Sequence, residues 1–441
     1  MKRRLRSLGL GILVTALVVV FLLAGCAKEV TPPITPTPPI TPTPPAAPEG
    51  TLKFGMVMDF SGPISAVYAA AGRAPKDYFN MINERDGGIY SAKDKKYYKV
   101  ELLWGDDEYK KAKEVTLIKD LIGKGIICLT TQSSGENATA RPLCDAAKVP
   151  DIVGGGGRVC FDPPGYLFAN QSWYPEGTAV NIKMIQEKWK EKGETRPVKL
   201  GFLLGDYEWS HAAFPEGMMD WIKSQGIDIV GTEWYAMTDK DVTTQLTKLK
   251  AKKPDFIMGV HYTSQIAMIA RQARSIGITI PIVQNFYTLD NASAKLAPEA
   301  LEGCFGGINY GMREDGLDKA PGMKEMLDYN EKTYGETPYP AGYNCYMTGY
   351  LAAYKFRTAA EKALAKKGYP ITGEDIYNEL VAFKNQDMGG IEPLATYGNE
   401  RVPYHCLGGV IIKDGKMKRY WPMETKPPES IYEVFPWAKE K

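Results

Sequence analysis

Three small residues in the first half of the chain have the chemistry of an anion site. Ser133, Ser134 and Gly135 follow an apolar run and precede an amphipathic segment. Their hydroxyl and backbone N–H groups would lie at the positive end of a helix dipole, which favours a carboxylate. An ordinary serine N-cap is the alternative, and this pattern alone does not separate the two.

Four consecutive glycines, residues 154–157, follow the next apolar run. Glycine has no Cβ, so the backbone here can approach a ligand closely, although a flexible turn would use the same residues. A nucleotide-binding P-loop is excluded because no Gly-Lys-Ser/Thr follows the glycines.

Residues for catalysis or for a metal do not cluster in the sequence. His211, His261 and His405 are scattered, and no Gly-x-Ser-x-Gly motif occurs. We therefore expect neither an enzyme nor a cofactor or metal. Besides Cys26, six cysteines occur, and none has the CxxC spacing of a metal or redox site. They could form up to three disulfides or remain as free, buried thiols, and the sequence alone does not decide between these alternatives. The six cysteines are Cys128, Cys144, Cys160, Cys304, Cys345 and Cys406.

The first 50 residues predict export and anchoring. Basic residues precede an almost unbroken apolar run over 8–23, and Cys26 follows Ala24-Gly25. This order is typical of a secretory signal, residues 1–25, and Cys26 resembles the diacylated cysteine of a bacterial lipobox. An uncleaved anchor helix is the alternative. The Pro/Thr-rich segment that completes 26–50 favours a semi-rigid polyproline stalk.

The remaining residues, about 390, are too many for one core and indicate two lobes. Lys and Arg number 54 and Asp and Glu number 52, so the net charge is only +2. Because acids and bases are interspersed, we expect no nucleic-acid partner.

Strands and helices alternate in two series, which position these candidate residues. Apolar runs typical of buried strands alternate with segments whose apolar residues recur every three or four positions. One such helical segment carries Phe214, Met218, Trp221 and Ile222. The pattern predicts two doubly wound α/β units with parallel sheets. The expected strands are 52–60, 100–104, 126–130, 150–153, 198–204, 227–230, 255–260 and 280–283.

Several short motifs are informative through their order and spacing: Phe54-Gly55-Met56, Ser61-Gly62-Pro63, Gly105-Asp106-Asp107, Gln132-Ser133-Ser134-Gly135 and Arg271-Gln272-Ala273-Arg274. In this order the chain resembles the substrate-binding lipoproteins of ABC importers for branched-chain amino acids, the type I periplasmic binding proteins. The resemblance implies two lobes joined by a three-strand hinge, with the ligand cleft between them. The implied N-lobe combines 51–172 with 309–397, and the C-lobe combines 173–308 with 398–441.

The resemblance also implies which residues bind the ligand. Serines, backbone groups of the glycine run and aromatic rings at strand ends match the site positions of relatives. These positions are Tyr68, Ser133, Ser134, Gly155, Gly156, Trp209, Tyr262 and Tyr287.

Tyr287 departs from the family pattern. Amino-acid binders carry an acidic residue at this position, where it pairs with the ligand's ammonium group. A buried ammonium without a partner is costly, so carboxylic acids without an amine, amides and aromatic acids become candidate ligands. Asp206, Glu208 or Asp290 could substitute for the missing acid.

The function that we expect is capture of a hydrophobic amino acid, or of a related small carboxylate or amide, outside the cytoplasmic membrane. The lobes would close on the ligand. The expected protein is a lipid-anchored monomer that delivers the ligand to the permease subunits of an ABC importer. A ligand-sensing receptor subunit of the same fold and a stalked structural lipoprotein are the alternatives. Neighbouring permease and ATPase genes would separate transport from sensing.

Overall fold

The computed structural model describes residues 50–336 and 342–438. The predicted signal peptide, Cys26 and the stalk lie outside the described residues. None of the helices in the described part is both long and apolar enough to cross a lipid bilayer.

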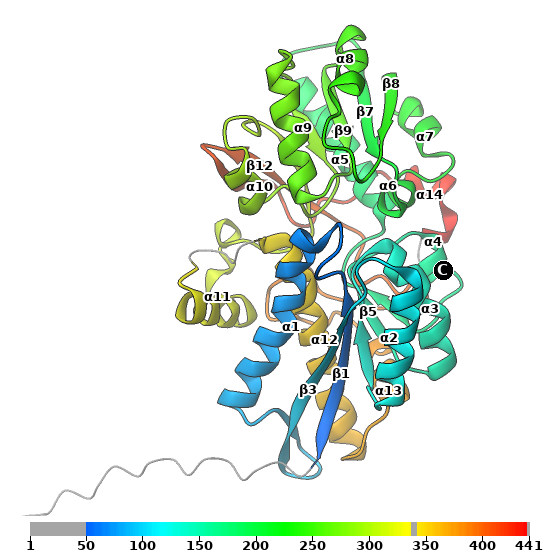
Figure 1. Ribbon diagram of the computed structural model, residues 1–441, viewed down its shortest axis with the longest axis vertical. Coiled ribbons are helices and arrows are strands. Elements are labelled where there is room, and N and C mark those ends of the chain that lie inside the picture. Colours follow the sequence, from blue (N-terminus) through cyan, green and yellow to red (C-terminus); the bar gives the residue numbers. More distant parts are fainter. Residues whose placement is uncertain (1–49, 337–341, 439–441) are drawn as a thin grey trace, which may run out of the picture. The chain divides into compact units, whose positions relative to one another are not determined.

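A six-stranded sheet forms the first lobe, here called the N-lobe (Figure 1). Its order is β2-β3-β1-β4-β5-β6, and all pairs are parallel except β2 with β3. Most residues of the central strand β1 are buried, as expected for a strand covered on both faces. The strands are β1 (Thr51–Met58), β2 (Ile89–Ser91), β3 (Lys96–Asp106), β4 (Cys128–Thr130), β5 (Asp151–Val153) and β6 (Leu167–Ala169).

Helices from two separate parts of the chain cover this sheet. The first group is α1 (Ser65–Arg85), α2 (Lys111–Gly123), α3 (Ser134–Ala147) and the short α4 (Arg158–Phe161). The second group comes from much later in the chain: α11 (Pro321–Tyr334), α12 (Tyr343–Lys367) and α13 (Gly373–Val381). Helix α12 packs against α1 and contacts β2, β4 and β5, so it completes the N-lobe core (Figure 1).

A seven-stranded sheet forms the second lobe, here called the C-lobe. Its order is β13-β12-β11-β10-β9-β7-β8, with parallel pairs from β8 to β11 and an antiparallel β12–β13 hairpin at the edge. The strands are β7 (Val198–Gly205), β8 (Ile227–Tyr235), β9 (Phe256–Gly259), β10 (Ile282–Gln284), β11 (Phe305–Ile308), β12 (Gly408–Lys413) and β13 (Lys416–Trp421).

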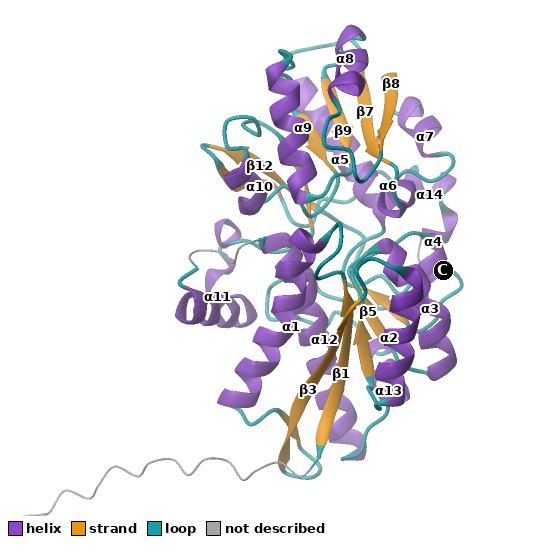
Figure 2. Ribbon diagram, in the orientation of Figure 1, coloured by secondary structure: helices purple, strands orange, loops and turns teal. Residues whose placement is uncertain are grey.

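Helices flank the strands in this lobe as well (Figure 2). They are α5 (Tyr174–Glu191), α6 (Glu208–Ala213), α7 (Met218–Ser224), α8 (Thr243–Ala251), α9 (Thr263–Ser275), α10 (Asn291–Leu296) and α14 (Ile431–Val434). The prediction of two α/β units with parallel-dominant sheets is therefore confirmed.

The helix predicted to carry both Phe214 and Met218 is in fact two helices, α6 and α7. Phe214 terminates α6 because Pro215 disfavours a helical conformation in the residue before it. Gly217 then has a φ of 89°, which no helix interior accepts, and α7 begins after it.

A hydrogen-bonded cluster joins three segments that pass between the two sheets. The Tyr404 hydroxyl contacts the backbone oxygens of Asn170 (3.1 Å) and Asn309 (3.4 Å). Lys355 and Glu392, both fully buried, form an ion pair at 2.8 Å, and Lys355 also donates to the Asn170 side chain. Segments far apart in the sequence are thus held together at one place.

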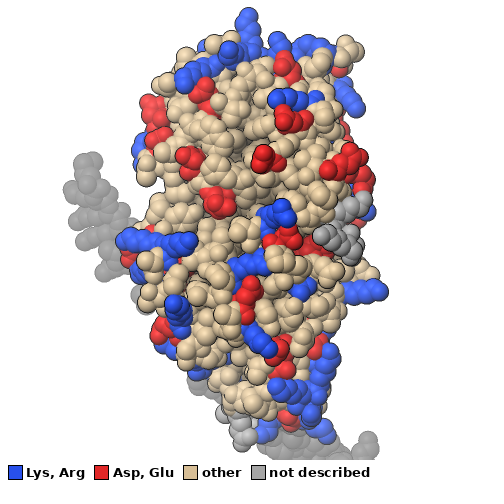
Figure 3. Space-filling view, turned by 90° about the vertical axis from the view of Figure 1, so that its right-hand side faces the viewer, with Lys and Arg blue, Asp and Glu red and all other residues tan. Residues whose placement is uncertain are grey.

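Cysteines and surface charge show no special arrangement in the described part of the chain. The six cysteines that it contains are all buried and free. On the face shown in Figure 3, Lys and Arg side chains are interspersed with Asp and Glu side chains.

Candidate ligand-binding site

A small cavity lies where residues following the strands of both sheets meet. Parallel sheets bind ligands outside the carboxyl ends of their strands, and this cavity occupies that position. Six of the eight predicted site residues line it: Tyr68, Ser133, Ser134, Trp209, Tyr262 and Tyr287. Its volume is only about 30 Å³, and we call it the aromatic cavity.

The N-lobe contributes polar groups from the start of α3. The Ser133 side chain caps this helix and accepts a hydrogen bond from the Glu136 backbone N–H at 3.1 Å. In return a Glu136 carboxylate oxygen accepts the Ser133 backbone N–H at 2.9 Å, which completes a capping box. Ser133 is therefore an N-cap, and its hydroxyl also interacts with that of Tyr109. Ser134 donates to the Tyr174 hydroxyl at 3.3 Å.

The C-lobe contributes aromatic rings that pack on one another. The Trp209 ring centroid lies 5.4 Å from that of Tyr262 and 5.7 Å from that of Tyr287. Trp209 is only 5% exposed, and its indole N–H has no hydrogen-bond partner among the described residues. A buried donor without a partner is costly, and an acceptor on a bound ligand would satisfy it.

Tyr287 crosses from the C-lobe to the N-lobe and closes the aromatic cavity. Its hydroxyl donates to the Gly154 carbonyl oxygen at 2.6 Å, while its own carbonyl accepts from the Asn344 side chain. Phe286 and Tyr287 have φ values of 60° and 46°. Left-handed backbone is strained for bulky residues and is found mainly where the surroundings enforce it. The loop after β10 is therefore held in a strained, closed arrangement.

Gly155 and Gly156 are not among the residues that line the cavity. The Gly155 carbonyl accepts from the Asn137 side chain, and a Cβ on Gly155 would lie 2.4 Å from Gln171 Nε2. A Cβ on Gly156 would lie 2.8 Å from Cys160 Sγ. In this arrangement both glycines are required by close packing within the protein.

Four further residues line the aromatic cavity: Val67, Gln132, Tyr174 and Thr288. Gln132 and Thr288 adjoin residues that the sequence motifs did identify. Tyr174 begins α5 shortly after the three-residue strand β6, which is too short for its apolar pattern to predict a strand end there.

No charged side chain lines the aromatic cavity among the described residues. Asp290 caps α10 through the backbone N–H of Ala292, and burial raises its pKa to about 6. Asp206 is exposed beside His211, and Glu208 points into a different pocket. None of the three acids considered as substitutes at the Tyr287 position therefore faces this cavity.

His261 is a structural residue in this arrangement. It is fully buried, and its Nδ1 lies 2.9 Å from the Tyr235 hydroxyl. Burial lowers its pKa to about 3, so the imidazole is neutral at physiological pH. Among residues 50–336 and 342–438, no group of three His, Cys, Asp or Glu side chains is arranged to hold a metal.

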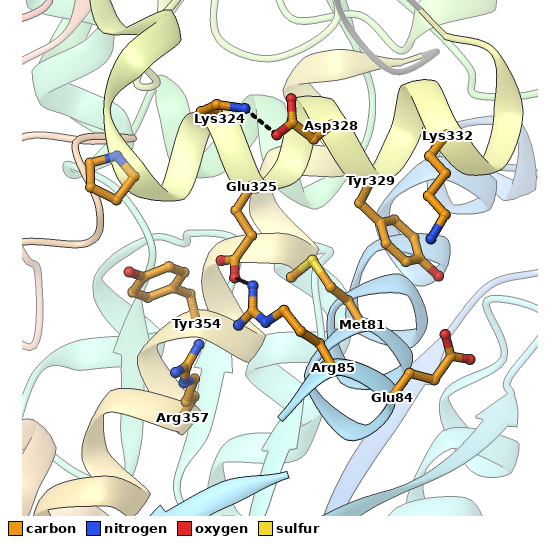
Figure 4. A pocket seen from close by; sticks show the side chains of 11 residues that line it. Met81, Glu84, Arg85, Lys324, Glu325, Asp328, Tyr329, Lys332, Tyr354 and Arg357 are labelled. Atoms are coloured by element: carbon orange, nitrogen blue, oxygen red, sulfur yellow. Dashed lines mark hydrogen bonds and ion pairs between the residues drawn. The ribbon is translucent and has the colours of Figure 1, made fainter. Parts of the chain in front are cut away.

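A larger cavity of about 800 Å³ lies between α1, α11 and α12 (Figure 4). Charged side chains line it, and four of them form two pairs: Arg85 with Glu325 and Lys324 with Asp328. It lies on helices and away from the strand ends, where parallel sheets bind their ligands. The aromatic cavity is therefore the better candidate for ligand binding.

The model of the family described as periplasmic binding protein matches residues 51–416. The chain is 21% identical over 393 residues to Leu/Ile/Val-binding protein homolog 7 of Brucella abortus, which covers 84% of this chain and 91% of that one.

Solved structures share the fold. A branched-chain amino acid ABC transporter protein from Thermus thermophilus with bound valine has a TM-score of 0.75 at 20% identity, covering 88% of this chain and 99% of that one. A fatty acid ABC transporter substrate-binding protein from Thermomonospora curvata gives 0.72 at 19%, covering 88% and 95%. A solute-binding protein from Rhodopseudomonas palustris in complex with 3,4-dihydroxybenzoic acid gives 0.67 at 16%, covering 86% and 99%.

These findings agree with the two sheets, the strand-end cavity and the order of the sequence motifs. The match to the family model indicates a binding protein that works outside the cytoplasm. The chain belongs to the periplasmic binding protein family.

Proposed function

We propose that this protein captures a small carboxylate or amide with an apolar or aromatic body and presents it to the permease of an ABC importer. One observation carries the proposal. The aromatic cavity combines hydroxyl donors at the start of α3 with a wall of aromatic rings, and no charged side chain lines it among the described residues.

The hydrogen-bond donors suit an oxyanion or carbonyl oxygen. Ser133 and Ser134 offer hydroxyl groups, and a helix start leaves its first backbone N–H groups without partners inside the helix. Trp209 adds an unpartnered indole N–H. Valine and 3,4-dihydroxybenzoic acid, bound by two structural relatives, both carry a carboxyl group.

The same cavity disfavours a free ammonium group. Burial raises the pKa values of Tyr68, Tyr262 and Tyr287 above their ordinary values, so these phenols stay neutral. An ammonium placed among them would lose its hydration shell and gain no carboxylate partner. Branched-chain amino acids remain in the proposed class, and we expect them to bind less tightly than the matching acids without an amine.

Ligand entry requires the closed arrangement to open. Typical ligand pockets measure about 300 to 1,000 Å³, whereas this cavity measures about 30 Å³. Tyr287 occupies the space between the lobes and holds Gly154. A ligand would displace the Tyr287 ring and then stabilise closure by touching both walls.

The hinge of this motion would be three crossover segments, near 172–173, 308–309 and 397–398. The N-lobe would then consist of 51–172 and 309–397, and the C-lobe of 173–308 and 398–441. The cluster of Asn170, Asn309 and Tyr404 supports this assignment because it joins residues close to all three boundaries.

A thermal-shift screen of branched-chain and aromatic amino acids, their desamino analogues and their amides tests the ligand class. A ligand at 100 times its dissociation constant adds about 2.7 kcal/mol of stability. The proposal fails if the amino acids stabilise the protein more than the matching acids and amides. Small-angle scattering on the same samples should show the radius of gyration decreasing with the right ligand.

We further propose that Cys26 carries the lipid anchor and that residues 26–50 form the stalk. Labelling of expressing cells with a palmitate analogue should mark the wild type and leave Cys26→Ser unmarked. Equal labelling of both proteins would show that another residue, or none, is acylated.

A further inference from the structure

A second cavity opens beside the aromatic cavity, and we call it the acidic pocket. Its volume is about 640 Å³. Asp107, Glu114 and Glu136 line it from the N-lobe, and Glu208 lines it from α6 of the C-lobe. Lys111 is the only basic residue among its described lining residues.

Three of these carboxylates are buried and incompletely hydrogen-bonded. Asp107 and Glu136 are 1% exposed and Glu114 is 2% exposed. Each has one carboxylate oxygen without a hydrogen-bond partner among the described residues. Buried polar atoms are nearly always partnered in native proteins, so three unpartnered acceptors in one pocket indicate a missing donor.

Burial and mutual repulsion both disfavour the ionised form of these acids. Burial is the main cause that raises the pKa of Asp107 to about 6, of Glu136 to about 8 and of Glu114 to about 10. Repulsion adds to it, from Asp59 and Asp106 at Asp107 and from Asp151 at Glu114, as well as between the three acids themselves. A cation in the pocket would favour the ionised carboxylates and release protons.

Tyr109 separates the acidic pocket from the aromatic cavity. It lines the acidic pocket, and its hydroxyl interacts with those of Ser133 and Tyr262, which line the aromatic cavity. Burial raises the pKa of Tyr109 to about 12, so the separating group is neutral. The acidic pocket is therefore adjacent to the proposed ligand site but distinct from it.

The missing donor has the chemistry of an organic ammonium. The described residues hold no group of three acids arranged for a metal ion. An alkylammonium group carries three N–H donors and can therefore serve carboxylate oxygens that lie apart in one pocket. We propose that the acidic pocket binds a primary alkylammonium ion, and that a diamine extends from the three buried carboxylates to Glu208 on the other lobe. This inference does not depend on which ligand occupies the aromatic cavity.

Calorimetric titration with 1,4-diaminobutane at pH 7.5 tests the proposal. We expect saturable binding whose heat differs between buffers of different ionisation enthalpy, because protons leave the carboxylates. Glu114→Gln should weaken binding at least tenfold. Asp120→Asn, on the exposed face of the same helix α2, should bind like the wild type, and the neutral analogue 1,4-butanediol should not bind.

A second variant separates the two ends of the diamine. Glu208→Gln should weaken the binding of 1,4-diaminobutane at least threefold and leave the binding of butylammonium unchanged. This test does not depend on whether Glu114→Gln folds. Equal affinity of wild type and Glu114→Gln for the diamine would overturn the proposal. So would an equal loss in Ser134→Ala, because the amine would then occupy the aromatic cavity. Acid or amide binding in the aromatic cavity is measured separately and does not decide this outcome.

Discussion

Buried carboxylates gather beyond the strand ends of the N-lobe sheet, whereas aromatic rings gather beyond those of the C-lobe sheet. Asp107 follows β3 and Glu136 follows β4, while Trp209 follows β7 and Tyr262 follows β9. The two lobes share one architecture, and the residues just after the strands make their chemistry different. The fold sets where a ligand binds, and these short segments set what it is.

The two lobe edges also differ in how their contribution to stability depends on pH. The C-lobe wall gains its stability from burying rings against one another, which does not depend on pH. The N-lobe edge contains acids that burial keeps protonated, so its stability depends on pH. Substitutions on the two sides should therefore have effects of different kinds.

The largest effect is expected from Trp209→Ala. Removing this ring from the packed cluster should cost about 3–5 kcal/mol of unfolding free energy and at least tenfold in ligand affinity. Trp234→Ala is the matched control, because this other C-lobe tryptophan is 41% exposed and stacks on His211. Urea unfolding measures both variants. If both variants lose a similarly small unfolding free energy, the C-lobe wall is an open surface and not a packed cluster.

The next largest effect concerns pH and the N-lobe. Burial raises the pKa of Asp151 from 3.8 to about 7. Between pH 4 and 7 the folded protein therefore holds a proton that the unfolded chain has lost, so stability falls as pH rises. Going from pH 8 to pH 5.5 should add about 2 kcal/mol through this group alone. The protonated acids of the acidic pocket act in the same direction.

Asp151→Asn tests this assignment by removing the titrating group. The Thr131 hydroxyl lies 2.7 Å from Asp151 and 2.8 Å from Asn137 Oδ1, and its one proton serves only one of them. A protonated Asp151 resolves the conflict by donating to Thr131, and an asparagine amide can do the same. The variant should fold and show a weaker pH dependence of its melting temperature. An unchanged slope would assign the dependence to other acids.

The course of the chain was largely predictable, because periodic apolar patterns identify strands such as β1, β7 and β9. Six of the eight site residues predicted from motif positions line one cavity: five follow a strand within a few residues, and Tyr68 lies in the first turn of α1. Strand β6 and the β12–β13 hairpin escaped prediction because they are short or lie far along the chain from their partners. The acidic pocket escaped because its carboxylates come from separate elements that only the tertiary fold brings together.

Tyr287→Glu is expected to shift specificity about tenfold, or 1.4 kcal/mol. A carboxylate at this position would pair with a ligand's ammonium group. The affinity for leucine should therefore rise relative to that for its desamino analogue, 4-methylpentanoic acid. Tyr287→Gln is the control, since it removes the ring without adding charge. Calorimetry decides between them. Micromolar leucine binding by the wild type, with weaker binding of the acid, would contradict the proposed preference.

The smallest effects distinguish two neighbouring serines of the N-lobe wall. Ser133 caps α3, so Ser133→Ala should cost about 1 kcal/mol of stability. Ser134 donates only to the Tyr174 hydroxyl in the cavity. Ser134→Ala should therefore leave the melting temperature unchanged and weaken ligand binding about fivefold, the value of one neutral hydrogen bond. If Ser134→Ala instead lowers stability and spares binding, the polar groups of this wall serve the helix alone, and the ligand's oxygen atoms are held by the C-lobe.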